Sequence, residues 1–157
     1  MIPMANRDER DALPSEWQTM TDTAINAALQ ALHVPTKLLG YRYIFLAVHL
    51  ILMCGPRERI RIRRELYERI GACMDTTKPM INRSIRYAIT QAWRTAEPEV
   101  LRSYLGSMTA SLKDPPSNLE FIWLVAERVH LLVGEPTDAA YRPEERPFAA
   151  QIPRQTD

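Results

Sequence analysis

Apolar residues recur every three to four positions along most of this chain, which is the spacing of α-helices that bury one face. No stretch alternates apolar and polar residues over the length of a strand with turn signals at both ends. Proline, glycine and short polar runs divide the pattern into segments. We expect helices over residues 15–32, 38–53, 58–74, 78–94, 99–112 and 118–133. The predicted fold class is all-α, a compact bundle of about six helices.

The ends of several segments carry helix signals. Ser15 with Gln18, and Ser117 with Glu120, have the spacing of a capping box. Outside the helices, residues 1–14 are predicted to be a flexible N-terminal segment, and residues 134–157 a Pro-rich, disordered tail. Residues 15–133 then form one helical domain, which suits a chain of 157 residues with 46% apolar and 25% charged positions.

Within these helices, some single residues carry specific expectations. In the segment 58–74 we expect Ile60 to join the buried face and Arg69 to face water. Cys54 and Cys73 lack disulfide or metal-site spacing, so they are predicted to be small buried hydrophobes in a reducing compartment. The apolar run 38–54 is short for a membrane span and contains Arg42, so it is predicted to be a core helix.

Charge is distributed unevenly along the chain. From Arg57 to Arg94 there are ten basic and four acidic residues, a net charge of +6, whereas the whole chain carries only +1. Between Thr76 and Arg94 there is no acidic residue. Such a stripe is either an ordinary solvated face or a surface that neutralises nucleic-acid phosphates.

The arrangement of the basic segment favours the second interpretation. A basic helix, a short Thr-rich turn and a helix that opens with polar residues form the outline of a helix-turn-helix. Gly71 is the small residue expected to allow close approach of the second helix. The predicted apolar seam between the two helices consists of Ile70, Met74, Ile81 and Ile85.

In a helix-turn-helix, the N-terminal half of the second helix enters the major groove. The outward positions predicted to contact bases are Met80, Asn82, Arg83, Arg86 and Tyr87, and those predicted to contact phosphates include Arg64, Thr76, Thr77 and Lys78. Arginine pairs with guanine, and asparagine with adenine. The two threonines also fit simple helix capping, and the two roles are compatible.

Residues 20–133 contain, in this order, the stretches His33-Val34-Pro35, Gly40-Tyr41-Arg42-Tyr43, Leu66-Tyr67, Thr76-Thr77, Arg83 to Ile89, Ala92-Trp93, Lys113, Pro116-Ser117-Asn118 and Glu120-Phe121-Ile122. With these stretches the chain resembles the family of C-terminal DNA-binding effector domains of the response regulators that control sporulation in endospore-forming bacteria.

The resemblance implies a six-helix bundle with a helix-turn-helix that binds double-stranded DNA. It also implies transcription regulation in sporulation, homodimers on tandem boxes and contact with an RNA polymerase sigma subunit. Arg83 and Arg86 match the family's base-reading arginines, and Lys113 is expected to contact a phosphate. Met80 and Asn82 depart from the family's arginine and glutamate, so we expect an altered DNA box.

The family's regulators carry a phosphorylatable receiver domain before this domain. The 15 to 20 residues ahead of the first predicted helix leave no room for one. We therefore expect a stand-alone cytoplasmic effector, controlled by its abundance, by a partner or by constitutive binding.

Two other functions compete with DNA binding. A protein–protein interaction module that kept the fold but lost or altered base readout would fit Met80 in place of a charged residue. An enzyme is disfavoured, because His33, His49 and His130 lack ligand spacing and no phosphate loop, nucleophile elbow or carboxylate pair appears. We expect no cofactor, no metal and no membrane association.

Overall fold

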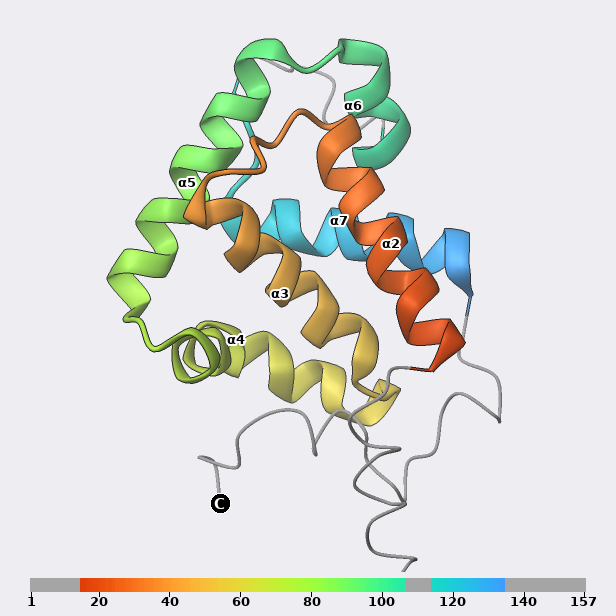
Figure 1. Cartoon of the computed structure of the whole chain (residues 1–157), viewed down its shortest axis with the longest axis vertical. Coiled ribbons are helices and arrows are strands. Elements are labelled where there is room, and N and C mark those ends of the chain that lie inside the picture. The colour runs from red at the N-terminus through yellow and green to blue at the C-terminus, as the bar shows by residue number, and fades with distance from the viewer. Residues whose placement is uncertain (1–14, 107–113, 135–157) are drawn as a thin grey trace, which may run out of the picture.

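The structure, a computed structural model, describes residues 15–106 and 114–134, and all regular elements in these residues are helical. The helices are α2 (Glu16–Ala31), α3 (Leu39–Met53), the short 3₁₀ helix η1 (Pro56–Glu58), α4 (Arg59–Met74), α5 (Lys78–Thr95), α6 (Pro98–Leu105) and α7 (Asn118–Val133) (Figure 1). The all-α bundle of six α-helices that the periodicity predicts is thus confirmed. None of the described helices is long and apolar enough to cross a membrane.

Short polar sequences set the helix ends. Ser15 and Gln18 form the predicted capping box, with backbone-to-side-chain bonds of 3.1 Å in both directions. Ser117 accepts a bond from the Glu120 amide at 3.2 Å, which is half of the second box. The fifth helix does not run to residue 112 as predicted, because it ends at Leu105 with Gly106 at a φ of 89°. Residues 107–112 lie outside the described part.

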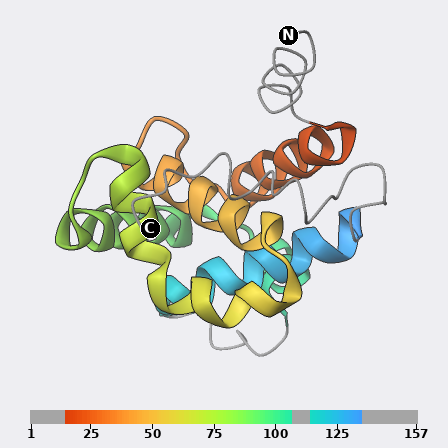
Figure 2. The ribbon, with the colours of Figure 1, turned by 90° about the horizontal axis from the view of Figure 1, so that it is seen from below.

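Helix α3 is the centre of the bundle and contacts α2, α4, α5 and α7. Its closest neighbour is α5. A Cβ atom at Gly40 would collide with the backbone carbonyl of Ser84 and would lie 2.6 Å from the Cβ of Ala88. The absence of a side chain at Gly40 therefore allows the two backbones to meet. Figures 1 and 2 place α5 at one side of the bundle, with α2 and the end of α7 at the other.

Helix α4 buries a narrower stripe than the sequence suggests. Ile62, Leu66 and Ile70 are buried, whereas Ile60 is 70% exposed, so the prediction that it joins the core is wrong. At 3.6 residues per turn, Ile60 lies about 160° around the helix from Ile62. The side chain of Arg69 is only 12% exposed and bonds Glu65 at 3.3 Å, so the prediction that it faces water is also wrong.

The two cysteines are unpaired thiols. Cys54 is buried, and that burial raises the pKa of its thiol to about 11. Burial also raises the pKa of Cys73, which is half-buried. Both are therefore protonated near neutral pH, and thiolate reactivity is low.

The close crossing at Gly40 gives a stability prediction. Replacement Gly40→Ala should lower the free energy of unfolding by about 1–3 kcal/mol, because backbone atoms must move to make room. This outcome opposes helix propensity, which favours alanine over glycine by about 1 kcal/mol. Urea denaturation followed by circular dichroism measures the change.

The exposed Ala27 of α2 supplies the control. Ala27→Gly should destabilise only through helix propensity. A Gly40→Ala variant at least as stable as the original chain would contradict the crossing.

Candidate nucleic-acid interface

Helices α4 and α5 are joined by the three-residue turn Asp75–Thr77. Asp75 adopts a left-handed conformation with a φ of 55°, and the Thr76 amide donates to the Gly71 carbonyl at 3.0 Å. A Cβ at Gly71 would lie 2.8 Å from the Thr76 oxygen but 3.8 Å from Cδ1 of Ile81. The missing side chain at Gly71 thus allows the backbone of the turn at Thr76 to pack against α4. The expected role, close approach of α5, is the smaller one.

The predicted seam between the two helices is present. Ile70, Ile81 and Ile85 are fully buried, and Met74 packs against the core from a half-buried position. The pair α4–α5 therefore has the connection and the apolar contact of a helix-turn-helix.

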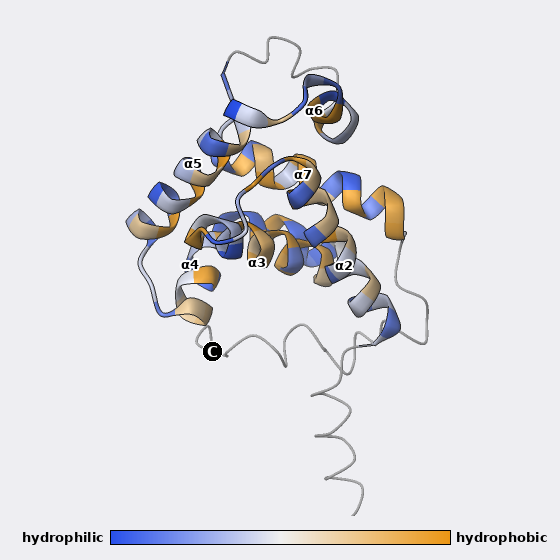
Figure 3. Ribbon diagram, turned by 45° about the horizontal axis from the view of Figure 1, so that its top comes forward, coloured by the Kyte–Doolittle hydropathy of each residue, from blue (hydrophilic) through white to orange (hydrophobic). Residues whose placement is uncertain are grey.

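Helix α5 has sharply different faces, and apolar and hydrophilic positions alternate along it in Figure 3. Its buried side consists of Ile81, Ile85, Ala88, Ile89 and Ala92. Arg83 is exposed on the opposite side, together with Met80 and Tyr87, which are 40% and 55% exposed. Asn82 is exposed as well, so four of the five predicted base-contacting residues reach solvent.

Asn82, although exposed, and the half-buried Arg86 form hydrogen bonds with residues at or just before the start of α7. Asn118, at the start of α7, is buried and donates from Nδ2 to the Asn82 carbonyl at 3.0 Å and to Asn82 Oδ1 at 2.9 Å. Arg86 is half-buried and donates from Nη1 to the Pro116 carbonyl at 2.8 Å and to Asn118 Oδ1 at 3.4 Å. The partners fix the Asn118 amide orientation, because carbonyls only accept and guanidinium groups only donate.

Tyr67 of α4 completes this cluster. Its hydroxyl donates to Asn82 Oδ1 at 3.4 Å. Burial raises the pKa of the Tyr67 phenol, and a side-chain hydrogen bond with Asn118 acts in the opposite direction. The phenol is therefore protonated near neutral pH and able to donate. The sequence analysis did not identify Tyr67 and Asn118 as residues that position Asn82, although each belongs to a stretch that carried the family resemblance.

The predicted phosphate contacts differ in their surroundings. Thr77 is the N-cap of α5 and accepts from the Met80 amide at 3.4 Å, so the capping role is present. Thr76 is half-buried, Arg64 is exposed, and Lys78 forms a solvent-exposed pair with Glu68 at 3.4 Å. Lys113 lies outside the described residues.

Residues 25–129 match the family described as "Sporulation initiation factor Spo0A C terminal". The match covers most of the described bundle, including the whole α4–turn–α5 unit. The chain belongs to this family. It is a family of DNA-binding regulatory domains rather than of enzymes.

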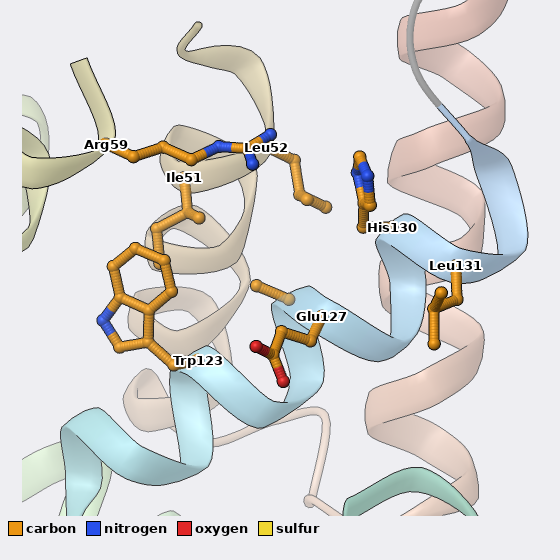
Figure 4. Close-up of a pocket in the computed structure, with 8 residues that line it drawn as sticks. Ile51, Leu52, Arg59, Trp123, Glu127, His130 and Leu131 are labelled. Carbon is orange, nitrogen blue, oxygen red and sulfur yellow. The ribbon is translucent and has the colours of Figure 1, made fainter. Parts of the chain in front are cut away.

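A concave site lies away from the α4–α5 pair. A cavity of about 350 Å³ opens between the end of α3, the start of α4 and the second half of α7 (Figure 4). Its lining is Ile51, Leu52, Arg59, Trp123, Ala126, Glu127, His130 and Leu131. These residues offer an apolar floor with isolated charges at the edge, and they supply no pair of carboxylates.

The histidines have structural surroundings in the described part of the chain. His49 Nδ1 lies 2.7 Å from Asp22 Oδ1, and His33 Nδ1 lies 3.1 Å from Thr95 Oγ1. The His49 contact joins α3 to α2, and the His33 contact joins the α2–α3 connection to the last residue of α5. No group of three or more His, Cys, Asp or Glu that could hold a metal occurs among the described residues.

The Asn118 cluster gives a second stability prediction. Asn118→Ala should lower the free energy of unfolding by about 1–3 kcal/mol, since it removes the buried amide that bonds the Asn82 carbonyl, Asn82 Oδ1 and Arg86. Thermal and urea unfolding measure the change. Gln30→Ala, on the exposed face of α2, is the control and should change stability by less than about 0.5 kcal/mol. Equal stability of both variants would show that the cluster contributes little.

Proposed function

We propose that this protein is a sequence-specific transcription regulator that places the N-terminal half of α5 in the major groove of DNA. One observation carries the proposal. Helix α5 is held by its apolar side in the bundle and turns an acid-free, arginine-bearing side to solvent. A rigid helix with exposed hydrogen-bond donors suits direct readout of base edges.

The structure suggests different roles for the two arginines. Arg83 is free to offer both guanidinium nitrogens to a guanine, the commonest specific contact in the major groove. Arg86 has Nη1 engaged by Pro116, so we expect it to read a base with its remaining donors while it is held by the loop before α7. Met80 and Tyr87 would add apolar and hydroxyl contacts beside Arg83.

Asn82 has a more restricted role than its residue type implies. A bidentate contact with adenine needs the side-chain oxygen as an acceptor and the nitrogen as a donor. The oxygen of Asn82 already accepts from Asn118 and Tyr67. Asn82 therefore contributes a hydrogen-bond donor only. We expect it to tolerate any base that presents a hydrogen-bond acceptor at that position.

The turn and its flanks would fix the register on the duplex. Lys78 and the two threonines lie on or beside the first turn of α5, whereas Arg64 lies on the exposed side of α4. Lys113 is part of the same proposal by resemblance. Phosphate contacts of this kind position a protein without reading sequence. From the family, we further expect homodimers on tandem boxes and contact with a sigma subunit.

Arginine and lysine substitutions in α5 test the proposal. Arg83→Ala should lose about 1–3 kcal/mol of discrimination between the preferred site and a shuffled site. Lys78→Ala should weaken binding to the two sites about equally and lower the slope of log K against log salt by about 1. The measurement is fluorescence anisotropy at several salt concentrations, with a site selected from a random DNA pool. Arg102→Ala on α6 removes the same charge and should change neither quantity.

A protein–protein interaction module is the second candidate. The cavity of Figure 4 favours it, because Leu131 on its rim is 75% exposed and the neighbouring Leu132 is 57% exposed. Apolar side chains around a concave site are typical of partner binding. If the full chain does not bind duplex DNA, or if its affinity for DNA does not change with salt, this candidate is favoured over a DNA-binding regulator.

A further inference from the structure

Three exposed arginines follow one another on the outer side of α4. Arg57 lies in η1, which leads directly into α4 through Glu58 in a helical conformation, and Arg61 and Arg64 follow. Spacings of four and three residues put the three on one side of the helix. The next position on this side is Glu68, which pairs with Lys78 of α5. The strip Arg57–Arg61–Arg64 therefore continues to the start of α5.

This strip is electrostatically unfavourable for the isolated protein. None of its three arginines forms an ion pair with another described residue, while the nearby Glu65 pairs with Arg69. Like charges three and four residues apart destabilise a helix, and cations near its N-terminus oppose the helix dipole. The first turn of α4 has no acid, and its N-cap, Glu58, makes no side-chain capping hydrogen bond. An anion bound along the strip would relieve this repulsion.

The length of α4 shows where that anion would lie relative to α5. Arg61 precedes the end of the helix at Met74 by about 20 Å at 1.5 Å per residue, which exceeds the major-groove width of about 12 Å. Figure 1 shows α4 extending along the lower edge of the molecule, away from the start of α5. The far end of the strip is thus beyond the groove that α5 would enter.

We propose that Arg57, Arg61 and Arg64 form a second phosphate-binding strip, which holds duplex DNA flanking the box read by α5. The proposal rests on the proposed DNA-binding function and extends its footprint. Continuity with the helix-turn-helix favours DNA over an acidic protein partner. So does composition, because the strip contains three cations and one exposed apolar neighbour, Ile60, whereas protein interfaces have an apolar centre.

Two duplexes and a double variant test the strip. One duplex contains only the selected box, and the other adds about 10 base pairs, one helical turn, on each side. For R57A/R61A, the slope of log K against log salt on the long duplex should become shallower by about 1.8, which is 0.9 per lost phosphate contact. On the short duplex, the slope should match that of the unsubstituted protein.

Charge and stability controls complete the experiment. R57K/R61K keeps the cations and should keep the slope on both duplexes, while K37A/R102A removes two exposed charges elsewhere and should also leave it unchanged. The thermal midpoint of R57A/R61A without DNA should equal or exceed that of the unsubstituted protein, because the repulsion is reduced.

The outcomes separate the two proposals. An unchanged slope on the long duplex, or an equal loss on both duplexes, would overturn the flanking strip and leave readout by α5 intact. A loss with R57A/R61A that also appears with K37A/R102A would reduce the strip to a general effect of net charge and overturn it. No binding by the unsubstituted chain to either duplex would overturn both proposals.

Discussion

The position of α5 depends on a backbone contact that no side chain could provide. At Gly40, α3 meets the Ser84 carbonyl and the Ala88 methyl group of α5 without an intervening Cβ. Because α3 also contacts α2, α4 and α7, this one crossing places α5 relative to most of the bundle. The branched side chains Ile81, Ile85 and Ile89 then fill the space on either side of it. Rotation of α5 about its axis would expose these side chains and drive backbone into backbone.

Contacts at two places, beside α7 and at the N-terminal end of the helix, complete the orientation of α5. On one side, Asn118 bonds the Asn82 carbonyl, and Arg86 bonds the loop before α7. At the N-terminal end, the tight turn at Gly71 and the Thr77 cap set where the helix begins. The solvent side that carries Arg83 is what these contacts leave free. A reading surface built on a fixed helix is more exact than one on a loop, because its side chains lose less entropy on binding.

The sequence predicts the helices and the apolar seam between α4 and α5 well. It does not predict which side chains form contacts with residues of another helix. Periodicity places Ile70, Ile81 and Ile85 correctly, since each repeats at helical spacing in a single register. It fails at Ile60, because Ile60 and Ile62 are both apolar and only the packing of α4 decides which one is buried. It also fails to foresee the contact of Asn118 with Asn82, which are 36 residues apart. From residue type alone, Arg83 and Arg86 are predicted to have the same role in base contact. In the structure Arg83 is exposed, whereas Arg86 is bonded to the Pro116 carbonyl.

Under the proposed function, affinity and specificity belong to different parts of the α4–α5 pair. Contacts to phosphates supply affinity that depends on salt but not on sequence, whereas contacts to base edges supply discrimination. In this chain Arg61 and Arg64 lie on α4 whereas Arg83 lies on α5, and Asn82 is held so that only its nitrogen is available. On this proposal, substitutions at outward positions of α5, such as Met80, would change the preferred box while the proposed phosphate contacts of the strip and the turn keep the protein on DNA. The side chains that orient α5 do not have this freedom. They also pack in the bundle, so their substitution lowers the stability of the fold.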